Sequence, residues 1–93
     1  KSGVSDLVVM DARGGWFGLY MEFKASSPHT AALAQSQHDW LALADERGYC
    51  AILAVGLEEA KAVLAEYAEL VPTYHHNTAR VHLSSGTEWR KGE

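Results

Sequence analysis

The chain has 93 residues, of which 47% are hydrophobic and 22% charged, and its formal net charge is −4. This balance is typical of one globular domain and excludes a disordered or low-complexity chain. The negative charge argues against a uniformly basic nucleic-acid binder, and the apolar runs are far shorter than the roughly 18 residues of a membrane span. Because no signal-peptide pattern opens the chain, we expect a cytoplasmic protein, from a bacterial or phage-infected cell, cut from a longer polypeptide.

The first expected elements are two strands joined by a tight turn. Residues 7–10 (LVVM) form a short apolar run, which predicts a strand covered on both faces. Residues 14–15 (GG) then predict a turn, because glycine readily adopts the positive φ of tight hairpins. Residues 16–24 predict a second strand. Its alternating side chains form two faces: Leu19, Met21 and Phe23 on one, Tyr20, Glu22 and Lys24 on the other.

A helix is expected next, after a loop that contains a Ser-Ser-Pro sequence. Residues 31–47 have helical periodicity, with Trp40, Leu41 and Ala44 on one stripe. Gln37 lies on the same stripe, three residues before Trp40. A polar residue where the pattern favours an apolar one is a local conflict, and such conflicts often mark functional positions.

The remaining elements complete an α/β pattern. Residues 49–55 predict a third strand, which contains Cys50 in an apolar run and therefore predicts a buried thiol rather than a nucleophile. Residues 57–70 predict a second helix, whose apolar side is formed by Ala60, Val63, Leu64 and Tyr67. Weak alternation at residues 79–83 is compatible with a further strand but leaves the fold of the C-terminal tail open. The order β-β-α-β-α predicts an α/β layer architecture.

Two carboxylates lie where these strands would bring them together. If the first two strands pair as a hairpin, Asp6, just before the first strand, and Glu22, near the end of the second, become cross-strand neighbours. Adjacent carboxylates repel, and Mg²⁺ is typically held by one or two carboxylates with water and phosphate oxygens. Lys24, on the same strand face, would orient a water or stabilise developing charge. The alternative interpretation is that Glu22 and Lys24 lie on an ordinary solvated strand face and that Asp6 is a turn residue before a strand.

Three segments, in this order and spacing, resemble the virus-type replication-repair nuclease (VRR-NUC) domain, a branch of the PD-(D/E)XK nuclease superfamily. They are residues 3–7 (GVSDL), residues 18–24 (GLYMEFK), and residues 37–41 (QHDWL) followed by Gly48 and Tyr49. The resemblance runs over about residues 1–70. It implies a restriction-endonuclease-like α/β core, in which a small mixed sheet is flanked by helices.

The resemblance also implies roles for individual residues. Asp6 and Glu22 would ligate Mg²⁺, which Mn²⁺ can replace, together with the main-chain carbonyl of Phe23. Lys24 would be the catalytic lysine, and Gln37 the helix-borne glutamine of the active site. These roles follow from the positions of matching residues in the family pattern.

The function that this resemblance implies is a metal-dependent DNA endonuclease acting on branched or structured DNA. Small phage-encoded members are homodimers that cut four-way (Holliday) junctions, and a eukaryotic relative serves in interstrand-crosslink repair. DNA and a second copy of the chain are therefore the expected partners, and a membrane is not expected to be one. The alternatives are a non-catalytic, nuclease-like domain that binds DNA or protein, and a flap- or nick-directed nuclease.

Two departures from the family pattern affect the expected domain organisation. The family has proline where this chain has Ser5, and it carries a further acid on a helix upstream of the first motif. We therefore expect residues 1–71 to be a nuclease core that lacks its upstream helix. Residues 72–93 are expected to be an extension of unknown fold.

Histidines supply competing candidates for a site. The sequence His75-His76-Asn77, with His82 as a third ligand, could indicate an HNH-type nuclease or a metal site, but adjacent side chains point apart in an extended chain. A solvated tail is the favoured interpretation. His29 could contact a phosphate near the site or be an ordinary loop residue.

The tryptophans and their aromatic neighbours bear on the expected dimer. Trp16 and Trp40 are expected in the core or at a dimer interface rather than as base-stacking platforms, whereas Trp89 could equally contact DNA or pack. Trp16, Phe17 and Tyr20 crowd the second strand, and a domain this small is not expected to cover all three. An exposed patch of this kind would mark an interface.

Overall fold

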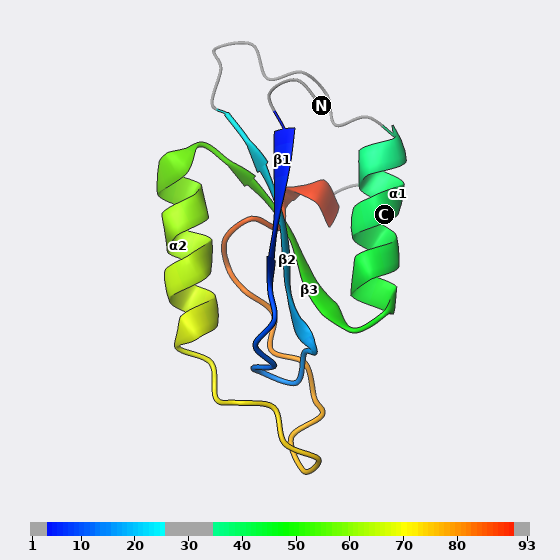
Figure 1. Cartoon of the computed structure of the whole chain (residues 1–93), viewed down its shortest axis with the longest axis vertical. Helices are drawn as coiled ribbons and strands as arrows, with labels where there is room; N and C mark the ends of the chain where they lie inside the picture. Colours follow the sequence, from blue (N-terminus) through cyan, green and yellow to red (C-terminus); the bar gives the residue numbers. More distant parts are fainter. Residues whose placement is uncertain (1–3, 26–34, 91–93) are drawn as a thin grey trace.

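The computed structural model describes residues 4–25 and 35–90 of the chain. Its elements are β1 (Val4–Val9), β2 (Gly18–Lys24), α1 (Gln35–Glu46), β3 (Tyr49–Val55), α2 (Leu57–Ala68) and the short 3₁₀ helix η1 (Glu88–Arg90). The three strands form one mixed sheet in the order β1-β2-β3, with β1 antiparallel and β3 parallel to β2. The two long helices lie on opposite sides of this sheet (Figure 1). The expected α/β class and the order β-β-α-β-α are confirmed.

The two faces of β2 separate as the alternation of its side chains predicts. Leu19 and Met21 are buried on the α2 side of the sheet, and half-buried Phe23 packs against the same cluster. Tyr20 is buried on the α1 side. Glu22 alternates with Met21 and therefore faces the same side as Tyr20. This second face is buried at Glu22, so at that residue it is not the solvated surface that the simpler interpretation of Glu22 and Lys24 required.

Strand β1 differs from the expected strand. It ends at Val9 instead of Met10, and its side chains are not covered on both faces, because Leu7 and Val8 are 42% and 48% exposed. The reason is that both long helices pack against β3, at the opposite edge of the described sheet from β1. An apolar run of four residues predicts a strand without showing where in the sheet it lies.

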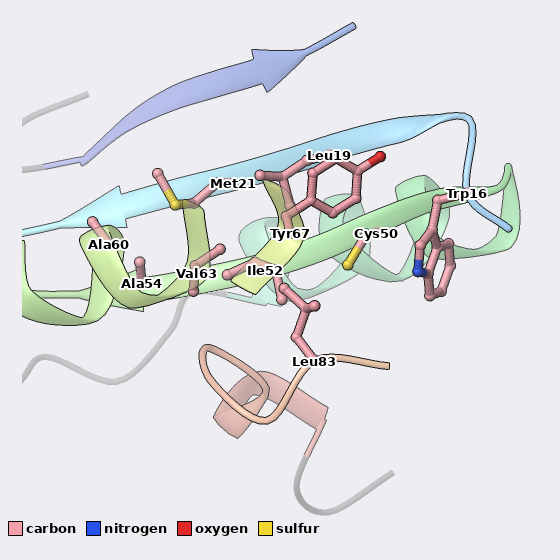
Figure 2. Close-up of a cluster of buried hydrophobic side chains, with 10 residues drawn as sticks. All are labelled: Trp16, Leu19, Met21, Cys50, Ile52, Ala54, Ala60, Val63, Tyr67 and Leu83. Atoms are coloured by element: carbon pink, nitrogen blue, oxygen red, sulfur yellow. The ribbon is translucent and has the colours of Figure 1, made fainter. Parts of the chain in front are cut away.

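Two apolar clusters hold the sheet to its helices. The larger one lies between the sheet and α2 (Figure 2): Trp16, Leu19, Met21, Cys50, Ile52, Ala54, Ala60, Val63, Tyr67 and Leu83. The smaller one lies on the α1 side: Tyr20, Leu41, Ala51, Leu53 and Trp89. The thiol of Cys50 is buried, as expected, and this burial raises its pKa to about 12. Leu64, expected on the apolar side of α2, is 37% exposed.

The C-terminal segment packs onto this layered core. Residues 79–83 do not form a strand, because they bond at isolated points, such as the Val81 N–H to the Gly14 carbonyl at 2.8 Å. The segment contributes Leu83 to the larger cluster and Trp89 to the smaller one. Gly86 has a φ of 72°, and a Cβ there would collide with Ile52, so glycine permits the close approach to β3.

Within the described ranges, neither long helix has the length and apolar character that crossing a membrane requires.

Candidate functional site

The site begins with a pair of carboxylates held by the sheet itself. Asp6 and Glu22 are directly opposite each other in the antiparallel register of β1 and β2. Directly opposite residues share a face, with Cβ atoms about 4.5–5.5 Å apart. The hairpin pairing inferred from the sequence is therefore confirmed, although Asp6 lies within β1 and not before it.

The two carboxylates differ in their exposure to water. Asp6 is exposed, whereas Glu22 is only 1% exposed and is the one buried charged residue of the described chain. The hydroxyl of Tyr20 lies 3.5 Å from Oε1 of Glu22, in a long hydrogen bond that the hydroxyl donates. A buried carboxylate with a second one beside it is stabilised by hydrogen bonds, a proton or a cation. This burial makes an ordinary solvated strand face the wrong interpretation of Glu22.

A pocket of about 370 Å³ opens over this pair, and α1 forms its other wall. Asp6 and Glu22 line it from the sheet, and Ser36, Gln37 and Trp40 line it from α1. The helix brings Gln37 to the carboxylates because Gln37 and Trp40 are three residues apart and share one side of α1. Three of the four side chains singled out in the sequence thus meet in one pocket, and their catalytic roles stay predictions.

Lys24 is placed differently from the other three. It is the last residue of β2 and lies on the same strand face as Glu22, but it is not among the described residues that line the pocket. Its main-chain carbonyl accepts a 2.8 Å hydrogen bond from the Gly56 N–H, which follows β3. Successive carbonyls along a strand point to opposite neighbours. The Phe23 carbonyl therefore points toward β1, the strand that carries Asp6.

Tyr20 is a site residue that the sequence reasoning did not assign. Burial raises the pKa of its hydroxyl, and the nearby carboxylates of Asp6 and Glu22 raise that pKa further. The hydroxyl therefore stays protonated at neutral pH and can donate to a carboxylate. The alternation along β2 contained the signal, because Tyr20 precedes Glu22 by two residues on the same face.

Trp40 stands at the rim of the pocket instead of in the core. It is 53% exposed, and its ring meets the Tyr20 ring edge to face, with centroids 6.4 Å apart. The other two tryptophans are buried. Trp16 donates from Nε1 to the Val81 carbonyl at 2.8 Å, and Trp89 from Nε1 to the Ala51 carbonyl at 3.0 Å. Trp16 thus belongs to the larger buried cluster, and Trp89 packs in the smaller one.

The expected aromatic interface patch is not present as proposed. Trp16 and Tyr20 are covered by their own chain, and Phe17 alone of the three is substantially exposed, at 65%. The smaller buried cluster and the C-terminal segment supply the cover that the sequence did not predict. The homodimer stays a prediction without this support.

The histidine candidates do not form a second site. His75 and His76 are exposed, and His76 stacks on Tyr74, whereas His82 contacts Trp16 edge to face. No group of three or more His, Cys, Asp or Glu side chains in the described residues could hold a metal ion. His29 lies outside the described residues.

Comparison with known proteins agrees with this geometry. Neither a protein-family model nor a curated protein sequence matches the chain. A solved structure of a VRR_NUC domain protein matches with a TM-score of 0.70 and 27% sequence identity. The match covers 87% of this chain and 62% of that one, so this chain spans less than two thirds of that protein. Fold, element order and sequence identity together support a VRR-NUC domain in this chain.

Proposed function

We propose that the chain is a Mg²⁺- or Mn²⁺-dependent endonuclease that hydrolyses phosphodiester bonds in branched or structured DNA. One observation carries the proposal. A buried carboxylate, Glu22, is paired across the sheet with Asp6, and both open into a pocket that Gln37 also lines. The similarity to a VRR_NUC domain protein supports a nuclease-like domain.

The donor set fits a hard divalent cation of the Mg²⁺ type. Because no larger group of metal-binding side chains exists among the described residues, the ion would take the two carboxylates from this chain. Mg²⁺ is typically held in this way, by one or two carboxylates plus water and substrate phosphate oxygens. The Phe23 carbonyl, which points toward β1, is a further candidate ligand.

The reaction we propose is hydrolysis of one phosphate ester bond. The oxygen of a water molecule bonds to phosphorus, and one P–O ester bond breaks. The attacking water loses a proton, and the leaving oxygen takes up a proton to become a hydroxyl. When bound, the metal would neutralise the two carboxylates and supply positive charge at a phosphate oxygen. The products are a phosphate monoester and an alcohol.

The remaining residues would act by hydrogen bonding and charge. The protonated Tyr20 hydroxyl donates to Oε1 of Glu22 and thereby orients that carboxylate. The Gln37 amide offers both a donor and an acceptor to a water or phosphate oxygen in the pocket. Lys24, half-buried at the end of β2, would place its ammonium near the developing negative charge of the phosphate.

Four-way junctions are the first substrate to test, with a homodimer as the active form. A junction needs two symmetric cuts, and a two-fold dimer would supply two sites related by the same symmetry. Light scattering at micromolar concentration should then give twice the chain mass. A chain that stays monomeric, alone and on junction DNA, would replace this proposal with a flap- or nick-directed nuclease.

The decisive experiment is a cleavage assay on labelled duplex, flap and four-way junction DNA, with and without Mg²⁺. We expect metal-dependent cleavage by the wild-type chain and its loss in Glu22→Gln. Glu69→Gln is the matched control, because Glu69 is exposed just beyond the end of α2, on the other side of the sheet. Absence of cleavage on all three substrates would favour the non-catalytic, nuclease-like domain instead.

A further inference from the structure

A second pocket, of about 340 Å³, lies beside the carboxylate pocket. Val8, Tyr20, Trp40, Leu43, Arg47 and Tyr49 are among the residues that line it. Its walls come from β1, β2, α1 and the start of β3, and they are largely apolar and aromatic. Among its described lining residues, Arg47 is the one charged side chain. We call it the aromatic pocket.

The aromatic pocket continues the carboxylate pocket along the sheet. Val8 and Tyr20 are register partners, two residues along from the partners Asp6 and Glu22 and on the same face. Two residues of antiparallel strand span roughly 6.8 Å. Trp40 lines both pockets, which therefore adjoin at this side chain. A chain molecule with one unit over the carboxylates would place its next unit over the aromatic pocket.

The chemistry of this second pocket favours a planar group attached to an anion. Trp40 is 53% exposed, while its contact with the Tyr20 ring holds its orientation. Exposed aromatic rings beside a basic side chain form the usual platform for single-stranded nucleic acid, because every base offers a π-face for stacking. Arg47 lies one turn beyond Leu43 and lines the same pocket, so it brings a positive charge to which a phosphate next to the base could bind.

We propose that the aromatic pocket holds one unpaired nucleobase of a DNA substrate, stacked on Trp40, with Arg47 contacting the adjoining phosphate. The inference rests on the proposed function, since it takes the scissile phosphate to lie over Asp6 and Glu22. It deepens that function by naming a substrate feature. The enzyme would require a nucleotide that is unpaired or flipped next to the cut, so intact duplex would be a poor substrate.

The test measures how strongly the bases of a single strand couple to Trp40. Binding of a short labelled single-stranded DNA is compared with binding of an abasic strand of equal length and charge. Both are measured by fluorescence anisotropy in the Glu22→Gln background, where cleavage is not expected. We expect removal of the bases to weaken binding about 5- to 150-fold, and to weaken it much less once Trp40→Ala is added.

Three further variants keep this test specific. Phe17→Ala removes an even more exposed aromatic ring that does not line the aromatic pocket, and it should leave the effect of the bases unchanged. Trp40→Phe keeps a ring and should retain most of the effect. Arg47→Gln should weaken both strands equally and reduce the slope of log affinity against log salt by about 0.7.

The outcomes separate this inference from the proposed function. If the wild-type chain cleaves DNA but Trp40→Ala leaves the effect of the bases unchanged, the inference of a nucleobase pocket is wrong and the proposed nuclease function is retained. If removal of the bases weakens binding through Trp40 while no substrate is cleaved, the inference of a nucleobase pocket is supported and the proposed endonuclease activity is contradicted. Loss of self-association in Trp40→Ala without any coupling to the bases would overturn the inference, because the pocket would then join two copies.

Discussion

The two faces of the sheet use alternate residues of the same strands for different purposes. On the α2 side, Leu19 and Met21 enter a cluster of ten buried residues, in which apolar side chains fill the space between sheet and helix. On the α1 side, Tyr20 belongs to a smaller cluster, Glu22 lies next to the Tyr20 hydroxyl, and two pockets remain between the sheet and the helix. A strand that is buried on both faces can therefore give stability from one face and a polar site from the other. Four predictions test this division.

The largest expected effect is on stability, at the α2 face. Trp16→Ala should lower the free energy of unfolding by about 3–5 kcal/mol, because it removes a fully buried ring and its hydrogen bond to the Val81 carbonyl. Urea denaturation followed by circular dichroism would measure this change. The neighbouring Phe17→Ala, at a 65% exposed position, should change the free energy of unfolding by less than about 0.5 kcal/mol. Similar losses in the two variants would contradict the assignment of Trp16 to the core.

The second effect is on cleavage, at the α1 face. Glu22→Gln should lower the cleavage rate by about 100- to 1,000-fold, the scale of losing one electrostatic stabiliser, without lowering the melting temperature. The amide keeps the shape of the side chain and removes one of two adjacent negative charges. Mn²⁺ should raise the melting temperature of the wild-type chain and not that of the variant. Undiminished cleavage by Glu22→Gln would show that the α1 face is not the catalytic face.

The third prediction distinguishes a role of Gln37 in cleavage from a role in the stability of helix α1. Gln37→Leu should lower cleavage about 10- to 100-fold, as for a group that supports a metal site, with the melting temperature unchanged or raised. Gln35→Leu is the matched control, because Gln35 is on the same helix but exposed, bonded to Asp39 at 2.8 Å. A large loss of stability at unchanged specific activity would instead make Gln37 a structural residue.

The smallest effect is a pH dependence of stability that Cys50 causes. Burial raises the pKa of its thiol from 9.0 to about 12. A folded-state pKa above the unfolded one gives stability that is present below pH 9 and lost as the pH rises toward 12. By pH 10 the loss should reach about 1 kcal/mol. Comparing urea denaturation of wild type and Cys50→Ala at pH 8 and pH 10 isolates this contribution. Equal pH dependence in both would contradict it.

Local patterns were sufficient for the elements and for part of the site. The third strand was predicted over residues 49–55 and observed over the same residues. Alternation along β2 separated Met21 from Glu22, and a turn between two strands implied that Asp6 would face Glu22. The position of Gln37 on the Trp40 stripe implied that both would lie on one side of a helix. Each of these inferences needs only neighbouring residues or one hairpin.

The sequence by itself determined the α/β order, the two faces of β2 and the pairing of two carboxylates, because side-chain period and hairpin pairing are local properties. Tertiary structure alone decided that Glu22 is buried, that β1 leaves Val8 exposed, and that Trp89 is buried. These outcomes depend on which segments, distant in the chain, pack against each strand. Periodicity gives the direction of a side chain, whereas burial depends on what arrives from elsewhere in the chain to cover it.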